Sequence, residues 1–266
     1  MASNSLVASA VTKLTITKTI PLGSYRSIPF VRLEGMAYGE LNPTENIPDL
    51  ADAPRNARGN VDYQTRVVLI APADPRQSQG RLLVDVPNRG LPVSHAFYNS
   101  PRQRPLPIGS LDAGLGFLQE QGWMLVSTQW ELGHGFEPPQ FVDTNGETRY
   151  VEAAGFAAVR DVARFLRDSN QADNPLAGAV KRLYAAGYSQ TSRFLKSFLL
   201  NGFNVAEGKQ VIEGFHLVGG AAGQLPLMAS GIGPGTVAGS TPAPPNLEHR
   251  GVHEEPFTYA AVVATL

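Results

Sequence analysis

A serine lies where the sequence changes from the pattern of a strand to the pattern of a helix. The stretch YAAGYSQTSRFLKSFL, from Tyr184 to Leu199, holds Ser189 between a short apolar run and an amphipathic segment. On a tight turn of this kind the hydroxyl projects above the sheet, and the first amides of the helix lie beside any oxyanion that forms there. The positive end of the helix dipole adds to this effect. The pattern predicts that Ser189 is a nucleophile of acyl transfer.

The motif around the serine is incomplete. Gly187 and Ser189 match the first and third positions of G-x-S-x-G, and Thr191 replaces the last glycine. A serine before a helix is also a common N-cap, which accepts a hydrogen bond from an amide of the first turn, and for an isolated G-x-S this is the usual explanation. The context favours the nucleophile, because a strand pattern precedes the serine, a helix pattern follows it, and strand–helix units come before both.

The turn after an earlier strand offers the groups that would stabilise an oxyanion. The apolar run Arg81 to Val86 ends in Pro87-Asn88-Arg89-Gly90, where the proline cannot continue a ladder. We expect this turn to lie beside Ser189. The backbone N–H of Gln190 is then the first predicted oxyanion donor, and that of Arg89, or of its neighbour Gly90, the second. An ordinary turn is the alternative explanation for the same four residues.

These residues need a sheet to position them, and the chain alternates strand and helix patterns. Strands that alternate with helices along a chain imply right-handed crossover connections between parallel strands, and therefore a parallel sheet. The three earliest strands have no helices between them and indicate an antiparallel N-terminal section, so the expected class is α/β with a mixed sheet. The predicted strands are Thr12–Thr19, Phe30–Tyr38, Tyr63–Ala71, Arg81–Val86, Trp123–Trp130, Arg182–Tyr188 and Phe215–Val218; the predicted helices are Ala113–Gln121, Val151–Arg167 and the segment after Ser189.

Composition limits the classes of function. The 266 residues fit a single domain, and a formal net charge of -1, from 22 basic and 23 acidic residues, gives no long-range field for nucleic acid or an anionic membrane. The absence of cysteine excludes disulfides, thiolate zinc sites and cysteine nucleophiles. No apolar run is long enough to span a membrane, and the N-terminus makes a poor signal peptide. We therefore expect a soluble protein.

Four stretches together resemble the alpha/beta-hydrolase superfamily, and within it a bacterial family of alpha/beta hydrolase domain proteins. They are APRNARG (53–59), VDVPNRG (84–90), RDVARFLR (160–167) and GYSQTSRFLKSFLLNGFN (187–204), and the resemblance runs from about Ile28 to Tyr259. It implies an α/β-hydrolase fold, with a mostly parallel mixed sheet, helices on both faces and antiparallel N-terminal strands. It also implies a serine hydrolase, an esterase that forms an acyl-enzyme on Ser189 with a small-molecule ester and needs no cofactor.

The general base and the carboxylate that such a serine needs are hard to find downstream of it. In this fold they follow the serine in the order acid, then histidine. No aspartate follows Ser189; the acids there are Glu207, Glu213, Glu248, Glu254 and Glu255, and the histidines are His216, His249 and His253. Because the resembling family continues further, we expect the missing partners and the last strands beyond Leu266. A non-catalytic binding module with the same scaffold is the alternative.

Each downstream histidine has a plainer explanation than catalysis. His216 alternates with apolar residues and is predicted to be a strand histidine. His249 and His253 are predicted to lie in a solvated loop, since Gly251 interrupts the helix that an H-x-x-x-H metal pair would need. A role for one of them as the base stays open.

Two further segments are candidates for the surroundings of the site. Trp130, Glu131 and His134 follow a strand at the carboxyl edge of the sheet, where they would either line the substrate site or form a structural loop. Residues 223–256 are rich in proline and glycine and are predicted to form a loop or lid. An incomplete sheet would also expose an apolar edge, so we expect the isolated chain to associate with itself.

Overall fold

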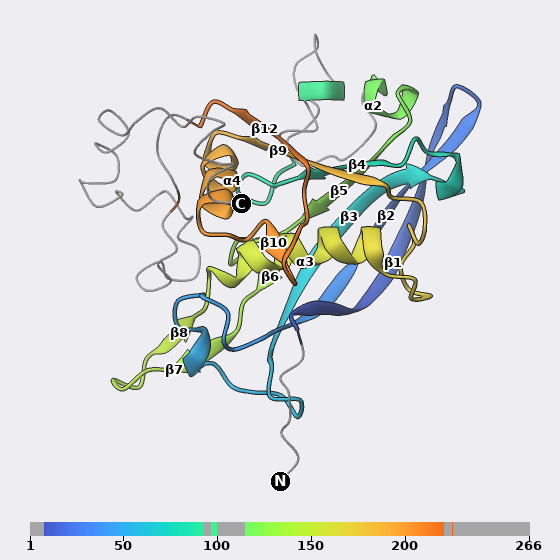
Figure 1. Ribbon diagram of the computed structural model, residues 1–266. Helices are drawn as coiled ribbons and strands as arrows, with labels where there is room; N and C mark the ends of the chain where they lie inside the picture. The colour runs from blue at the N-terminus through green and yellow to red at the C-terminus, as the bar shows by residue number, and fades with distance from the viewer. Residues whose placement is uncertain (1–7, 93–96, 100–114, 221–224, 226–266) are drawn as a thin grey trace.

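The computed structural model describes residues 8–92, 97–99, 115–220 and 225. A twisted sheet of eight strands runs through the molecule (Figure 1), with the short strand β6 (Phe136–Glu137) paired to β3. From one edge to the other, the remaining strands are β1 (Ala10–Tyr25), β2 (Ile28–Leu41), β3 (Val61–Pro72), β5 (Trp123–Thr128), β4 (Arg81–Asp85), β9 (Arg182–Tyr188) and β12 (Gly214–Val218).

The sheet is mixed in the way that the sequence predicted. The pairs β1–β2, β2–β3 and β3–β5 are antiparallel, and the pairs β5–β4, β4–β9 and β9–β12 are parallel. Because β4 precedes β5 in the chain but lies between β5 and β9, the chain crosses over and returns. This order places the carboxyl ends of β4 and β9 side by side.

Helices cover both faces of this sheet. On one face, α3 (Ala154–Asp168) and α4 (Gln190–Leu200) bury an apolar core that includes stacked rings of Phe156 and Phe194, with centroids 4.2 Å apart. On the other face, the single-turn helix α2 (Phe117–Glu120) packs Leu118 against a smaller cluster. Apolar residues at helical spacing along α3 and α4 explain why these two segments form helices and which side of each is buried.

Short elements complete the described chain. Two small hairpins pair β7 (Gln140–Val142) with β8 (Thr148–Tyr150), and β10 (Val205–Ala206) with β11 (Lys209–Gln210). Two 3₁₀ turns cover Leu50–Asp52 and Pro75–Gln77. None of these was expected from the sequence, because segments of two or three residues carry no periodicity to detect.

Several predicted boundaries were wrong; the first strand, for example, was predicted over Thr12–Thr19 and runs from Ala10 to Tyr25. Within the described part of the helix predicted over Ala113–Gln121, only α2 is helical. It begins after Gly116 because this glycine has a left-handed φ of 74°. The strand predicted to reach Trp130 ends at Thr128, after which the chain turns toward the end of β4. The helix predicted from Val151 begins at Ala154.

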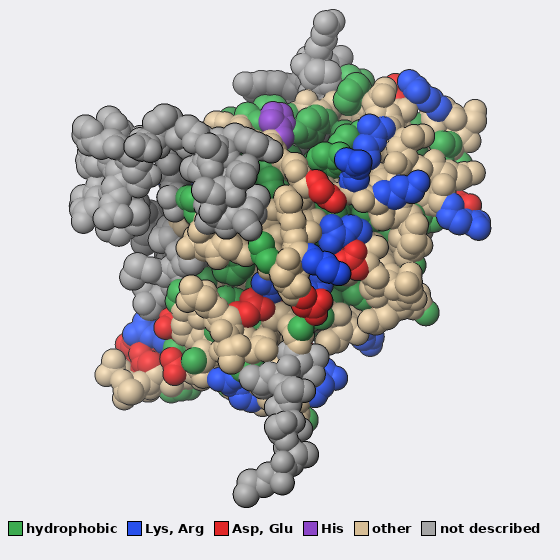
Figure 2. Space-filling model, viewed as in Figure 1, with side chains coloured by type: hydrophobic (Ala, Val, Ile, Leu, Met, Phe, Trp, Pro, Cys, Tyr) green, Lys and Arg blue, Asp and Glu red, His purple; other side chains and the backbone are tan. Residues whose placement is uncertain are grey.

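The described surface carries charges of both signs. Figure 2 shows acidic and basic side chains interspersed on one face, without a large area of a single sign. No helix in the described ranges has the length and apolar character needed to cross a membrane. The segment predicted as a loop or lid, 223–256, lies outside the described residues except for Leu225, whose carbonyl accepts a hydrogen bond from Ser197 Oγ at 2.6 Å.

Candidate active site

Ser189 forms the turn between β9 and α4 in a conformation that non-glycine residues rarely adopt. Its φ and ψ are 56° and -110°, and its side chain is exposed. Such a backbone costs on the order of 1–3 kcal/mol and persists only where the surroundings enforce it. The hydroxyl makes no capping hydrogen bond to α4. Ser189 therefore does not serve as an N-cap by its side chain, and its oxygen is left to face solvent.

The residues on either side of the serine explain how the turn is held so tightly. A Cβ at Gly187 would lie 2.4 Å from the carbonyl oxygen of Thr191, so only glycine lets the helix backbone approach the strand this closely. Thr191 is fully buried, and its hydroxyl accepts a hydrogen bond from the N–H of Tyr188 at 2.9 Å. The threonine that departs from the G-x-S-x-G pattern thus bonds the turn internally instead of disrupting it.

The turn after β4 lies beside this elbow, as the sequence predicted. Asn88 and Leu91 exchange two backbone hydrogen bonds of 2.7 and 3.0 Å, and between them Arg89 and Gly90 have φ values of 51° and 76°. Positive φ at both central residues is typical of a type I′ turn. Asn88 Nδ2 donates to the carbonyl of Tyr188 at 2.8 Å, which joins the turn directly to the elbow. Within the described residues the N–H of Arg89 has no acceptor.

The segment after β5 lies behind both loops. Gln129 Nε2 donates to the carbonyl of Gly90 at 3.0 Å, and Trp130 Nε1 donates to the carbonyl of Pro87 at 2.8 Å. Glu131 accepts a hydrogen bond from Gln190 Nε2 at 3.1 Å. Trp130 and Glu131 are 5% and 4% exposed, and such burial favours a structural loop for these two residues. Sequence reasoning missed Gln129 and Asn88, although Asn88 lies inside a turn that it had singled out.

A pair of acidic side chains lies close to the same segment. Burial, the larger cause, and the nearby carboxylate of Glu131 together raise the pKa of Glu152 to about 8. At neutral pH Glu152 is therefore mostly protonated. Because Glu152 lies just before α3 and Glu131 just after β5, this interaction joins the start of the helix to the region behind the elbow.

The structure places few candidate partners for the serine. Of the downstream acids, Glu213 accepts from the N–H of Leu183 at 2.6 Å, and Glu207 pairs with Arg164 at 3.6 Å. His216 lies on β12 as predicted and its Nδ1 bonds to the hydroxyl of Tyr98. In the part of the chain that the structure describes, the hydroxyl of Ser189 has no hydrogen-bond partner.

Other histidines do not change this result. The ring of His134 packs against Gly90, where an added Cβ would lie 2.8 Å from its Nδ1. His249 and His253 lie outside the described residues, so both interpretations of them stay open. Across residues 8–92, 97–99, 115–220 and 225, no group of three or more His, Asp or Glu side chains is arranged to hold a metal ion.

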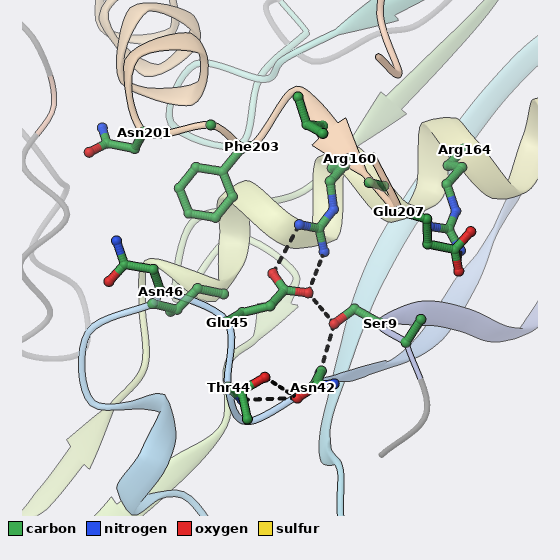
Figure 3. A pocket seen from close by; sticks show the side chains of 15 residues that line it. Ser9, Asn42, Thr44, Glu45, Asn46, Arg160, Arg164, Asn201, Phe203 and Glu207 are labelled. Carbon is green, nitrogen blue, oxygen red and sulfur yellow. Dashed lines mark hydrogen bonds and ion pairs between the residues drawn. The ribbon is translucent and has the colours of Figure 1, made fainter. Parts of the chain in front are cut away.

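A separate cavity of about 370 Å³ lies at the far end of α4 (Figure 3), beside Asn201 and Phe203. Its main polar group is Arg160, whose guanidinium donates to both carboxylate oxygens of Glu45 at 2.9 Å and to Asp161 at 2.8 Å. Ser9 also bonds to Glu45. These groups hydrogen-bond to one another, so the cluster joins separate parts of the fold.

Comparison with known proteins agrees with the fold. The family model described as "Alpha/beta hydrolase domain" matches residues 123–253, a range that contains the elbow but begins after the turn at Arg89. Taken with the strand order, this match shows an α/β-hydrolase fold, and the predicted fold class is confirmed. Comparison with curated proteins found no match.

Several solved structures are similar at low identity. The rice cell wall degrading esterase LipA from Xanthomonas oryzae is 17% identical with a TM-score of 0.33, and the match covers 75% of this chain and 46% of that one. A glucuronoyl esterase from Teredinibacter turnerae is 14% identical with a TM-score of 0.35, covering 73% and 45%. A glucuronoyl esterase from Solibacter usitatus is 15% identical with a TM-score of 0.31, covering 68% and 46%. This chain thus spans less than half the length of each.

Proposed function

We propose that the protein is a serine hydrolase that cleaves a carboxylic ester of a small molecule through an acyl-enzyme on Ser189. The observation that carries this proposal is the conformation of Ser189 itself, an exposed serine held at φ 56° without a capping bond. A strained backbone at the carboxyl edge of a sheet is typical of functional sites, because the fold must compensate for its cost. The family match to an alpha/beta hydrolase domain supports the same class of reaction.

The proposed reaction proceeds in two halves. Ser189 Oγ attacks the acyl carbon while its proton passes to a general base, and the amides of Gln190 and Arg89 donate hydrogen bonds to the oxyanion. The tetrahedral intermediate collapses, and the alcohol leaves with the proton from the base. Water, deprotonated by the same base, then attacks the acyl-enzyme and releases the acid and the free serine. No step needs a metal or a cofactor.

The general base of this scheme is a histidine, which the described residues do not bring to Ser189. His249 and His253 are the histidines of this chain that the sequence leaves open for the role. A histidine base would give the rate of serine modification a pH dependence centred about the ordinary histidine pKa of ~6.5. Substitution of His249 or His253 by alanine, measured across that range, shows whether either residue is responsible.

The decisive experiment is labelling with a fluorophosphonate, which reacts covalently with activated serines. We expect the wild-type chain to be labelled and Ser189→Ala not to be labelled. Ser192→Ala is the matched control, because Ser192 lies on the same helix but is 1% exposed. Circular dichroism of each sample confirms that it is folded.

Two outcomes would overturn the proposal. Equal labelling of the Ser189→Ala variant would mean that another serine reacts. Absence of labelling in folded wild-type protein would mean that the elbow lacks an activated nucleophile, and would favour the alternative of a binding module with a hydrolase scaffold.

A further inference from the structure

Three consecutive side chains contact the two loops of the candidate site. Gln129 and Trp130 bond to the carbonyls of Gly90 and Pro87 on the turn after β4, and Glu131 bonds to the side chain of Gln190 on the elbow. We call Gln129-Trp130-Glu131 the QWE segment. All three side chains are between 4% and 8% exposed, so they contact the two loops from inside the protein and do not face the solvent side where a substrate would enter.

The QWE segment is itself held firmly. The ring of Trp130 packs against Phe194 of α4 and Phe156 of α3, with centroid distances of 4.5 and 6.4 Å. A Cβ at Gly155 would lie 2.1 Å from the carbonyl oxygen of Trp130, so the start of α3 presses directly on the backbone of the segment. Contacts with both helices leave the QWE segment little freedom to move.

This arrangement matters because the two proposed oxyanion donors belong to separate loops. The N–H of Gln190 begins α4, whereas the N–H of Arg89 lies in a two-residue turn beyond the end of β4. Among the described residues, the last backbone hydrogen bond between the two regions is that from the Val86 N–H to the carbonyl of Ala186, at 3.1 Å. Beyond it, in the part of the chain that the structure describes, the two regions are connected by hydrogen bonds from side chains. Oxyanion donors must keep their positions to within about 0.5 Å to be effective.

We propose that Gln129, Trp130 and Glu131 are positioning residues, which hold the turn at Arg89 and the elbow at Gln190 as one rigid unit and so set the spacing of the two oxyanion donors. The inference rests on the proposed function, since the spacing has a catalytic meaning only if Ser189 is acylated. Asn88 adds a further connection between the two loops through its bond to the carbonyl of Tyr188. The QWE segment does not touch the reacting atoms, and acts through the amides alone.

The test uses variants that remove single hydrogen bonds and keep the packing. Trp130→Phe keeps an aromatic ring and removes the N–H donor to Pro87. Glu131→Met removes the acceptor for Gln190, while Glu131→Gln keeps an oxygen there and is the conservative rescue. Trp123→Phe is the matched control, because Trp123 is the other of the two tryptophans and lies on the opposite face, over Tyr184.

With an activated aryl ester as the substrate, we expect Trp130→Phe and Glu131→Met to lower kcat by about 10- to 100-fold, since loss of one oxyanion donor costs about 10²–10³. KM should change less than about twofold, because ground-state binding does not use the oxyanion contacts. Glu131→Gln should recover most of kcat, and Trp123→Phe should retain it. Equal kcat in all variants, or a rise in KM with kcat unchanged, would overturn the inference.

A second measurement separates this inference from the proposed function. Amide hydrogen exchange of residues 86–91 and 187–193 needs no activity, and we expect it to be at least ~5-fold faster in Trp130→Phe than in Trp123→Phe. If the wild type is not labelled by fluorophosphonate but the exchange still differs, the proposed function fails and the holding role stands. If the exchange is the same in both variants, the holding role fails whatever the activity.

Discussion

At the scale of single residues, the elbow depends on the backbone conformation and hydrogen bonds of a few residues. Ser189 accepts a left-handed backbone, and Gly187 accepts the close approach of the helix. Thr191 both accepts a hydrogen bond from the N–H of Tyr188, at 2.9 Å, and donates one to its carbonyl, at 3.2 Å. A residue that looked like a departure from a motif therefore supplies part of the stability of the turn.

This role of Thr191 predicts the effect of an isosteric change. Thr191→Val keeps the shape of the side chain and removes the hydroxyl, so the partly buried N–H of Tyr188 loses its acceptor. We expect the free energy of unfolding to fall by ~1–3 kcal/mol, the usual cost of an unsatisfied buried group. Thr191→Ser should lose less, since it keeps the oxygen. Urea denaturation of the three proteins provides the comparison, and a valine variant as stable as the wild type would contradict it.

At the scale of elements, the site is built where three strand ends and two helix starts meet. The carboxyl ends of β4, β5 and β9 lie together, and the starts of α3 and α4 pack on the loop that follows β5. Glu152, just before α3, and Glu131, just after β5, bring two carboxyl groups close together in this region. The free-energy cost of holding these two carboxyl groups close together in the folded protein depends on pH.

The sign of that dependence follows from the raised pKa of Glu152, about 8 against 4.5 in its ordinary state. Between pH 4.5 and pH ~8, Glu152 holds a proton in the folded protein that it has lost in the unfolded chain. The contribution of Glu152 therefore lowers the free energy of unfolding as the pH rises through this range, and it becomes constant above pH ~8. Glu152→Gln should remove this pH-dependent fall in the free energy of unfolding. The stability of the variant relative to wild type should therefore grow by ~1–2 kcal/mol from pH 5 to pH 9, a value reduced for partial exposure.

Denaturation at several pH values measures this difference. The control is Glu120→Gln, at an exposed position on α2. A difference between Glu152→Gln and wild type that stays constant with pH would show that the carboxyl of Glu152 is ionised in the folded protein at neutral pH.

At the scale of the whole molecule, a buried ionic cluster joins segments that are far apart in the sequence. Arg160 of α3 bonds to Glu45, in the loop after β2, and Glu45 in turn bonds to Ser9, just before β1 (Figure 3). Arg160 also bonds to its neighbour Asp161. The side chain of Arg160 is 6% exposed and that of Asp161 0%. The cluster therefore ties the antiparallel end of the sheet to the helix that packs behind the elbow.

Removal of the cation from this cluster should be costly. Arg160→Met leaves two carboxylates, Glu45 and Asp161, close together without their partner, and we expect a loss of ~3–5 kcal/mol in the free energy of unfolding. Arg76→Met is the control, since Arg76 forms an ion pair with Asp74 while its own side chain is 85% exposed. Exposed pairs contribute ~0–1 kcal/mol. Thermal or urea unfolding that finds equal losses in both variants would refute a structural role for the cluster.

The amino-acid sequence by itself determined the class of fold, the direction of the main strands and the position of Ser189, because these depend on local periodicity and on turn residues near one another in the chain. It also predicted that the turn at Arg89 lies beside the elbow, since the carboxyl ends of parallel strands share one edge. Only the tertiary structure decided that Trp130 and Glu131 are buried behind the two loops, and that burial beside Glu131 raises the pKa of Glu152. Each of these depends on contacts between residues distant in sequence, and such contacts leave no periodic signal in a single chain.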